Sequence, residues 1–405
     1  MRATLARPFL LLLLAAAGPA AAQSNDRLDA ALRSAVDGGR IPGVVAMVAD
    51  SERILYSGAF GARDAAAGAP MAMDTVFRIA SMTKPVTSVA VVMLIEGGQV
   101  GLDDPIGRHL PELAGKEVIA DFDAATGRYT TRPARGEITV RHLLTHTSGL
   151  AYGFSNETFY RLTEGTQSAS AVDYPLMHDP GTRWTYGEST RVLGRLVEKV
   201  SGKGLEAFMR ERIFEPLGMH DTNYRVAPEN LDRVATIHRR EDGRLVEAPN
   251  GNEVVSPPNG DGGLNSTAGD YIKFVQMLLR GGRAPDGTRL LSEASVALIG
   301  QNHMGDVRVE LQPSMVPALS EPFPLGAGRD TYGLGFQVTG SPAEPGLRAP
   351  GSMSWAGIFN TEFWIDPANG LGAVLLMQYL PFYDAAAIDT LLEFERGVYA
   401  TFADR

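Results

Sequence analysis

A serine and a lysine stand three positions apart just before an apolar stretch of the chain. Ser81 and Lys84 enclose the segment Ser-Met-Thr-Lys, and the mostly apolar residues 86–96 follow, ending at Gly97. Positions i and i+3 of a helix lie on one face, so a helix here brings the hydroxyl and the amine together. An adjacent base makes a serine hydroxyl nucleophilic, and a helix N-terminus offers N–H groups to a developing oxyanion. The spacing predicts acyl transfer at Ser81 with Lys84 as base, although so short a motif also recurs by chance.

Five ordered segments give this short motif its specificity. They are FRIASMTK at 77–84, ITVRHLLTHTSGL at 138–150, PGTRWTYGES at 180–189, RIFEPLGMHDT at 212–222 and GGLNSTAGDYIKF at 262–274. Together they resemble segments of class C β-lactamases, related penicillin-binding proteins and the esterases that share their fold, over nearly the whole chain after the N-terminal leader. The resemblance implies the penicillin-recognising, serine β-lactamase-like fold and a serine hydrolase that works through an acyl-enzyme.

Tyr186 occupies the position of the family's second catalytic element, the tyrosine of a Tyr-x-Asn motif. A phenol titrates at about 10 in water and becomes a useful base or proton carrier only beside a cation such as Lys84. The resemblance therefore implies a catalytic set of Ser81, Lys84 and Tyr186. Glu188 stands where the family commonly has Asn. An ionised carboxylate only accepts hydrogen bonds and repels an acidic substrate, so this departure disfavours anionic substrates.

A second departure concerns the inner strand that carries Lys-Thr-Gly in β-lactamases, where a cation and a hydroxyl hold the substrate carboxylate. Here the corresponding residues read Trp-Ala-Gly, which is similar to the Trp-Gly-Gly of the esterase branch. The resemblance also implies that the N–H groups of Ser81 and Ile358 form the oxyanion hole. The expected substrate-binding residues are Trp355, Ala356, Gly357, Glu188 and Tyr152.

Both departures favour neutral carboxylic esters over penicillins or D-Ala-D-Ala stems, because an anion-binding cation has become aromatic and an amide has become an acid. We therefore expect a carboxylesterase that needs no metal and no organic cofactor. The alternatives are a D-amino-acid peptidase or penicillin-binding protein, a β-lactamase, and a non-catalytic binding protein that keeps the fold. His142 and His146 are four positions apart but lack the rest of a zinc-binding motif, so no metal site is expected there.

The apolar pattern predicts the elements that position these residues. Continuous apolar runs bounded by turns predict hairpins over residues 43–60 and 359–379. Apolar spacings of three and four predict helices. These helices are expected at 26–37, 86–96, 192–200, 205–213, 271–279 and 391–402.

Strands at both chain ends around a helical middle predict an α/β (α+β) fold of the β-lactamase-like type. We expect residues 23–105 and 325–405 to form one sheet domain, an antiparallel sheet flanked by helices. Residues 106–324 are expected to form a mainly helical inserted region with loops. Within it, the Pro-, Gly- and polar-rich residues 300–330 predict a long loop over the surface or the site.

The first residues predict a targeting signal. Two arginines precede an apolar run at 9–17, and three alanines ending at Ala22 form a small-residue cleavage site. We predict a signal peptide over residues 1–22 and a periplasmic or secreted protein. The chain has no cysteine and a net charge of −10, which exclude disulfides and disfavour nucleic-acid binding. The expected partner is a small-molecule ester, with no stable membrane insertion after cleavage, and the oligomeric state stays open.

Overall fold

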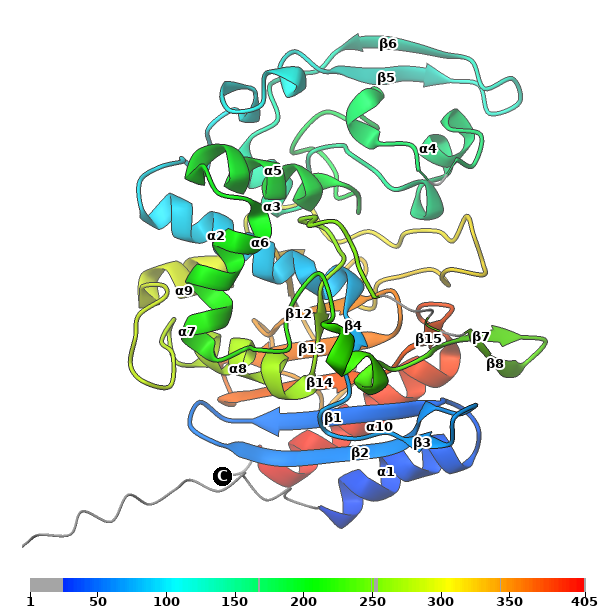
Figure 1. Cartoon of the computed structure of the whole chain (residues 1–405). Helices are drawn as coiled ribbons and strands as arrows, with labels where there is room; N and C mark the ends of the chain where they lie inside the picture. Colours follow the sequence, from blue (N-terminus) through cyan, green and yellow to red (C-terminus); the bar gives the residue numbers. More distant parts are fainter. Residues whose placement is uncertain (1–24, 167, 249, 251–253, 343, 404–405) are drawn as a thin grey trace, which may run out of the picture.

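The computed structural model describes residues 25–166, 168–248, 250, 254–342 and 344–403 (Figure 1). The predicted signal peptide, residues 1–22, lies outside these ranges and stays a prediction. In the described part of the chain, no helix is long and apolar enough to cross a membrane. Figure 1 shows the blue, orange and red segments gathered around a sheet, with most of the cyan and green segments above it.

The core of the fold is an eight-stranded antiparallel sheet to which both ends of the chain contribute. In spatial order its strands are β10 (Thr331–Tyr332), β11 (Gln337–Val338), β12 (Met353–Gly357), β13 (Thr361–Asp366), β14 (Leu371–Leu376), β1 (Gly43–Ala49), β2 (Ile54–Asp64) and β3 (Ala69–Pro70). The two predicted hairpins are present as β1–β2 and β13–β14. Strands β14 and β1 join the two halves, with Val45 opposite Leu376. The prediction of one antiparallel sheet built from both chain ends is confirmed.

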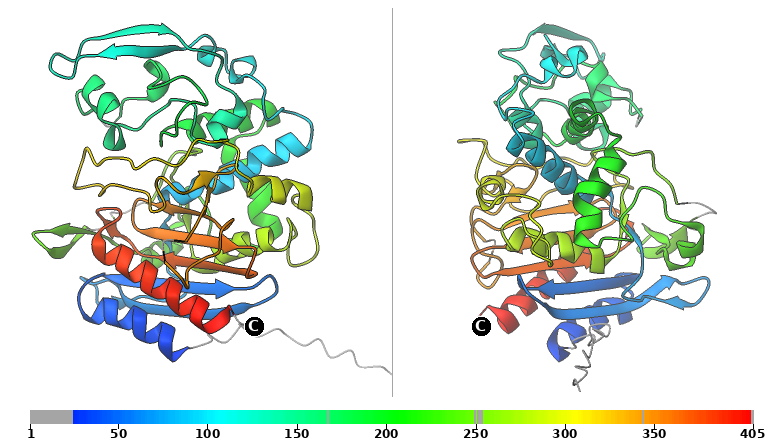
Figure 2. Two further views of the ribbon diagram at one scale, coloured as in Figure 1. Left: turned by 180° about the vertical axis from the view of Figure 1, so that it is seen from behind. Right: turned by 60° about the vertical axis from the view of Figure 1, so that its left-hand side comes forward.

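Helices from the two chain ends cover one face of the sheet. These are α1 (Asp26–Asp37) and α10 (Ala385–Phe402), which lie side by side in Figure 2. Gly397 permits this close approach, because a Cβ there would stand 2.6 Å from Leu28 Cδ2. Trp364 of β13 and alternate residues of β1 are buried in the same apolar cluster. Apolar burial therefore holds the two ends of the chain together.

The opposite face of the sheet carries α8 (Ala268–Leu279), which packs against β1 and β14. Strand β1 is buried on both faces, which explains why its sequence is continuously apolar rather than alternating. Beyond α8 lies α2 (Thr83–Glu96), in which residues 83–94 are all buried. A helix enclosed on every side needs no polar face, so its apolar sequence follows from its position.

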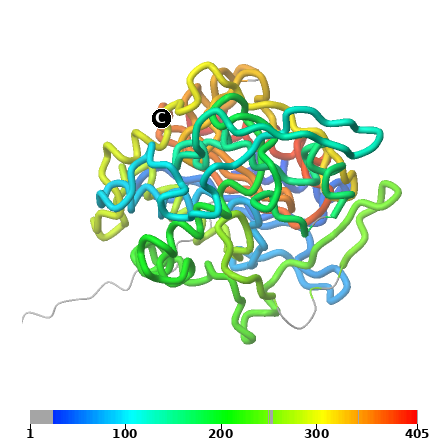
Figure 3. Tube along the Cα trace, turned by 90° about the horizontal axis from the view of Figure 1, so that it is seen from above, coloured from blue at the N-terminus to red at the C-terminus, as the bar shows by residue number. Residues whose placement is uncertain are grey.

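The chain between the two halves of the sheet supplies the remaining elements. Its helices are α3 (Val140–Leu144), α4 (Glu157–Leu162), α5 (Ser189–Ser201), α6 (Leu205–Met209), a π-helical turn (Arg210–Phe214), α7 (Glu215–Leu217) and α9 (Glu293–Ile299). Its strands are β5 (Glu117–Phe122), β6 (Tyr129–Pro133), β7 (Ile237–Glu241), β8 (Arg244–Ala248) and β9 (Asn265–Ser266). Strand β9 pairs with β4 (Phe77–Arg78), and β15 (Tyr379–Leu380) pairs with β7. Figure 3 shows the β5–β6 and β7–β8 hairpins projecting toward the same side of the molecule.

These two hairpins add to the sequence prediction, in which residues 106–324 are a mainly helical region with loops and no strand was specified. Their strands are polar and largely exposed, so they lack the apolar alternation by which a half-buried strand is recognised. The predicted loop at 300–330 is confirmed, because its described residues contain no helix or strand. The division into a sheet domain (23–105 with 325–405) and an inserted region stays a prediction.

Candidate active site

Ser81 lies on a short 3-10 turn, Ala80–Met82, that leads directly into α2. Ala80 has a φ of 44°, which is an uncommon conformation for a residue with a side chain. Such strain persists only where the surroundings hold the backbone in place, and it clusters at functional sites. Here β4 holds the approach to the turn through its pairing with β9, and the N–H of Ile79 donates to Leu264 O at 3.0 Å. The turn therefore fixes the direction of Ser81.

Lys84 lies one helical turn after Ser81, and its side chain points back toward the serine. Its Nζ donates hydrogen bonds to Ser81 Oγ at 2.9 Å and to the backbone oxygen of Asp261 at 2.6 Å. The residue is 1% exposed. No carboxylate in the described residues forms an ion pair with this amine. The predicted i, i+3 meeting of hydroxyl and amine is present in the structure.

Tyr186 reaches the same serine oxygen from a different part of the chain. Its hydroxyl donates to Ser81 Oγ at 2.8 Å, and the ring centroid is 4.9 Å from Lys84 Nζ. The next residue, Gly187, packs against the backbone of the 138–150 segment, since a Cβ there would stand 2.2 Å from Leu150 O. This contact brings two of the five family-like segments together beside α2.

The strand predicted to carry the oxyanion hole lies against the nucleophile turn. A Cβ on Gly357 would stand 2.3 Å from Ile79 O, so only glycine lets β12 approach this closely. Trp355 of the same strand packs against the Tyr186 ring with centroids 5.1 Å apart. Ile358 follows the strand and lines the same cavity as Ser81.

A cavity of about 180 Å³ opens from Ser81. Near the serine its wall is aromatic and apolar, and the contributing residues are Tyr152, Phe154, Tyr186, Phe323, Trp355 and Ile358. Ala356, Phe382 and Tyr383 also line the cavity. Phe323 belongs to the 300–330 loop, so this loop covers the site. The Tyr152 hydroxyl donates to the Asp261 carboxylate. Burial, reinforced by that carboxylate, raises the pKa of Tyr152 well above its usual value, which keeps the phenol neutral.

Glu188 is not among the residues that line this cavity. Its carboxylate accepts hydrogen bonds from the Ser170 hydroxyl and the Ala171 N–H, both at 2.8 Å, and lies 2.6 Å from an Arg191 nitrogen. Burial is the largest influence on its pKa and raises it, with Arg191 opposing. The structure therefore does not bring Glu188 to the substrate side, in contrast to Tyr152, Trp355 and Ala356, which line the cavity.

Sequence reasoning missed two residues beside the catalytic set, Asp261 and Arg191. Asp261 holds Lys84 through its backbone oxygen, which no side-chain motif can reveal. Arg191 links the carboxylates of Asp261 and Glu188, at 3.3 and 2.6 Å. The buried His146 lies among aromatic rings, 5.0 Å from the Tyr186 ring. Burial and, less strongly, Lys84 hold its pKa well below the usual range, so the imidazole is neutral.

His142 serves local structure. His142 accepts a hydrogen bond on Nδ1 from the N–H of Thr139, which caps α3. Among the described residues, no group of three or more His, Cys, Asp or Glu side chains is arranged to hold a metal ion.

The chain is similar to known proteins over most of its length. The family profile described as Beta-lactamase matches residues 28–397. The chain belongs to this family. Monacolin J acid methylbutanoyltransferase from Aspergillus terreus is 33% identical, over 95% of this chain and 97% of the relative. Lovastatin esterase from Penicillium rubens is 32% identical, over 93% of this chain and 98% of the relative. The unliganded structure of simvastatin synthase (LovD) from Aspergillus terreus superposes with a TM-score of 0.77 at 31% identity, covering 94% of this chain and 100% of that one.

These matches confirm the resemblance seen in the five segments and confirm the β-lactamase-like fold. They identify the chain as a member of a serine hydrolase and acyltransferase family of that fold. Its homologues act on small-molecule ester or acyl substrates, as their names state.

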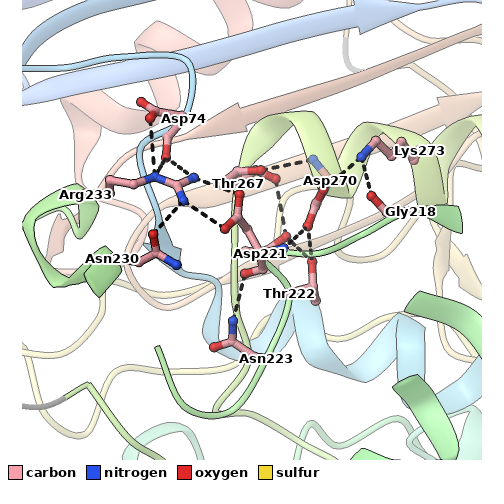
Figure 4. A network of polar contacts seen from close by, with 11 residues as sticks. Asp74, Gly218, Asp221, Thr222, Asn223, Asn230, Arg233, Thr267, Asp270 and Lys273 are labelled. Carbon is pink, nitrogen blue, oxygen red and sulfur yellow. Dashed lines mark hydrogen bonds and ion pairs between the residues drawn. The ribbon is translucent and has the colours of Figure 1, made fainter. Parts of the chain in front are cut away.

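Two of the five family-like segments contribute to a polar network away from the cavity (Figure 4). Arg233 donates to both carboxylate oxygens of Asp221, at 2.9 and 2.7 Å, and to Asp74 O. Asp270 accepts from the N–H of Asp221 at 2.7 Å and from Lys273 at 3.0 Å.

A further contact connects the network to β4, the strand that precedes the nucleophile. The hydroxyls of Thr222 and Ser266 are hydrogen-bonded at 2.8 Å, and Ser266 lies opposite Phe77 in the β4–β9 pair. These two segments therefore support the backbone that precedes Ser81 and do not enter the site.

Proposed function

We propose that the protein is a secreted serine hydrolase that cleaves carboxylic esters in two steps through an acyl-enzyme on Ser81. The observation that carries this proposal is a single oxygen, Ser81 Oγ, within 2.9 Å of Lys84 Nζ and 2.8 Å of the Tyr186 hydroxyl. A nucleophile needs a group that removes its proton, and the leaving group needs one that returns it. Both are within hydrogen-bonding distance here.

In the first step, Ser81 Oγ attacks the ester carbonyl carbon while the Lys84 and Tyr186 pair removes its proton. The carbonyl oxygen becomes an oxyanion, which the N–H groups of Ser81 and Ile358 stabilise. The carbon–oxygen bond to the alcohol then breaks, and the proton passes through Tyr186 to the leaving oxygen. The products of this step are the free alcohol and an acyl ester of Ser81.

In the second step, water attacks the acyl ester and gives its proton to the same pair. Collapse of the second oxyanion releases the carboxylic acid and returns the proton to Ser81. Lys84 and Tyr186 thus act in both directions, and neither step requires a metal or an organic cofactor.

The composition of the wall supports a neutral ester as substrate. Trp355 stands where β-lactamases have a lysine, and its ring is buried against Tyr186 and Tyr332. An aromatic wall favours apolar groups beside the scissile bond and offers no counter-charge to a carboxylate. This property disfavours penicillins and peptide stems near Ser81.

Transfer of the acyl group to an alcohol is a second candidate function. Monacolin J acid methylbutanoyltransferase is named as an acyltransferase and is similar over nearly the full length of both chains. The two functions share the acyl-enzyme and differ only in whether water or an alcohol accepts the acyl group.

The test compares the protein from Gln23 onward with its Ser81→Ala variant on p-nitrophenyl butyrate and on nitrocefin. Rapid ester cleavage that the variant loses, with little nitrocefin turnover, is the expected result. Rapid nitrocefin turnover makes the protein a β-lactamase instead, and silence on both substrates favours a peptidase or a binding role. Added alcohols then separate transfer from hydrolysis, because transfer yields a new ester at the expense of the acid.

Secretion is tested separately. The N-terminal sequence of the protein recovered from the periplasm or the medium is expected to begin at Gln23. Retention of residues 1–22 in a protein found only inside the cell contradicts this part of the proposal.

A further inference from the structure

The cavity continues past the aromatic wall to an inner end of different character. There it is lined by Ser354 of β12, Glu362 of β13, Arg348, and Leu391, Leu392 and Glu395 of α10. In the β12–β13 pair, Ala356 lies opposite Glu362 and Ser354 lies opposite Trp364, so these side chains share one face of the sheet. This is the face that α10 covers. The cavity therefore reaches from Ser81 to residues of α10.

Glu362 is a buried acid without a partner. It is 9% exposed, and it forms no hydrogen bond or ion pair with any described residue. Burial raises its pKa to about 8, with Arg348 opposing and Glu395 reinforcing the rise. A buried carboxyl that meets no donor is costly, and such groups require an explanation.

The charged neighbours of Glu362 are already occupied with one another. Arg348 donates to both carboxylate oxygens of Glu395, at 2.9 and 2.6 Å, and its N–H adds a third bond. Asp330 accepts from Gln337 Nε2 at 2.6 Å and from the N–H of Gly340. The nearest cation is thus neutralised, and Glu362 is the one acid at this end of the cavity whose hydrogen-bonding capacity is unused among the described residues.

A carboxylate on the same strand shows how this fold treats an acid with a structural role. Asp366 accepts hydrogen bonds from the N–H groups of Ala349, Ala368 and Asn369 and from the Tyr399 hydroxyl. These bonds hold its pKa below the usual value despite burial. Glu362, four residues earlier, has none of these partners and faces a cavity. Packing alone would be served better by an apolar side chain of the same size.

We propose that Glu362 binds a hydrogen-bond-donating group, a hydroxyl or an ammonium, at the far end of the substrate's acyl chain. The acyl chain is the part of the substrate that this cavity suits, because it stays on Ser81 while the alcohol and water exchange with solvent. The apolar wall near Ser81 then contacts the middle of the chain. The preferred substrates are esters whose acyl chains are apolar near the scissile bond and polar at the end. This inference rests on the proposed esterase function.

The test uses p-nitrophenyl esters with linear acyl chains of increasing length that end in methyl, hydroxyl or ammonium. Wild type, Glu362→Gln, Glu362→Met and the control Glu393→Gln, on the exposed face of α10, are compared by kcat/KM. We expect a chain length at which the polar-ended ester is preferred over the methyl-ended ester by about tenfold, in wild type and the control. Glu362→Met removes that preference, because it offers no hydrogen bond.

Glu362→Gln separates the two donor groups. It keeps hydrogen bonding and cannot ionise, so a preference for a hydroxyl survives in this variant, and a preference for an ammonium, which needs the ionised carboxylate, does not. Should Glu362→Met fail to fold, the wild type and Glu362→Gln still test the proposal. The proposal requires that the wild type prefer a polar-ended ester over the methyl-ended one, and the absence of that preference overturns it.

p-Nitrophenyl acetate separates this inference from the proposed function, since its acyl group is too short to leave the vicinity of Ser81. If every protein cleaves acetate but no chain length shows a preference for a polar end, Glu362 has no role in substrate recognition. The same conclusion follows if Glu362→Met keeps the preference for polar-ended over methyl-ended esters. Failure of the wild type to cleave p-nitrophenyl acetate, by contrast, overturns the proposed esterase function.

Discussion

Two polar regions of this protein draw mainly on different members of the five family-like segments, and they also differ in how their hydrogen bonds close. In the network of Figure 4, Arg233 donates to the Asp221 carboxylate, and Lys273 and the N–H of Asp221 donate to the Asp270 carboxylate. At Ser81, by contrast, a lysine and a phenol converge on one serine oxygen that also faces a cavity. A closed network fixes structure, whereas polar groups that face a cavity are free to act on a ligand.

The largest expected effect is the loss of activity in Ser81→Ala. Removing the nucleophile lowers kcat/KM for p-nitrophenyl butyrate by about 10³-fold or more, because the acyl-enzyme cannot form. The partly buried serine has no packing role, so the thermal midpoint stays within about 2 °C of wild type. The matched control, Ser34→Ala on the exposed side of α1, leaves both quantities unchanged. If Ser81→Ala unfolds as well as losing activity, Ser81 has a structural role like that of the residues in the network of Figure 4.

The opposite pattern is expected for Arg233→Met. This change leaves the Asp221 carboxylate, 29% exposed, without its main partner, so we expect a loss of about 2 kcal/mol in the free energy of unfolding. The folded variant keeps its kcat, because the network does not line the cavity. Urea unfolding measures the loss, and Arg161→Met, which breaks the exposed pair with Glu157, serves as the control at under about 0.5 kcal/mol. If Arg233→Met lowers kcat without lowering the free energy of unfolding, the contrast between a structural network and a separate active site is wrong.

Glu362 allows a sharper test of this comparison, through the pH dependence of the free energy of unfolding. The folded protein holds this proton up to a pKa of about 8, while the unfolded chain releases it near the ordinary pKa of 4.5. Between these values the unfolded state binds fewer protons, so this group lowers stability as pH rises. We expect wild type to lose on the order of 2 kcal/mol relative to Glu362→Gln between pH 5 and pH 8. Arg348, Glu395, Asp330 and Tyr383 surround the group in both proteins, so their titration cancels in the difference.

Thermal unfolding of both proteins across this pH range provides the measurement. A constant difference in stability from pH 5 to pH 8 means that Glu362 titrates as an ordinary surface acid, which contradicts its burial.

The smallest effect is expected for Tyr152→Phe. The variant keeps the aromatic wall and removes the hydrogen bond to the Asp261 carboxylate, whose backbone oxygen holds Lys84. We expect kcat on p-nitrophenyl butyrate to fall about threefold to tenfold with KM little changed, and Tyr129→Phe on the exposed β6 to have no effect. An unchanged kcat means that Arg191 is sufficient to hold Asp261.

Sequence alone predicted the elements whose side chains meet within a few residues or repeat with a fixed period. Ser81 and Lys84 share a helix face, and α1, β1, β2, β13, β14 and α10 carry clear apolar patterns. The exposed β5–β6 and β7–β8 hairpins lack such a pattern and were not predicted. Family resemblance added Tyr186, which no local spacing connects to Ser81.

Only the tertiary structure decided where the long-range groups point. Glu188 follows the predicted motif, yet its carboxylate turns to Arg191 and Ser170 rather than to the cavity. Asp261 holds Lys84 through a backbone oxygen that every residue type possesses. Glu362 reads as an ordinary acid in a strand, and only the cover of α10 leaves it buried without a donor. The sequence determines periodicity and residue chemistry, whereas burial and partners depend on segments hundreds of residues apart that meet only in the folded chain.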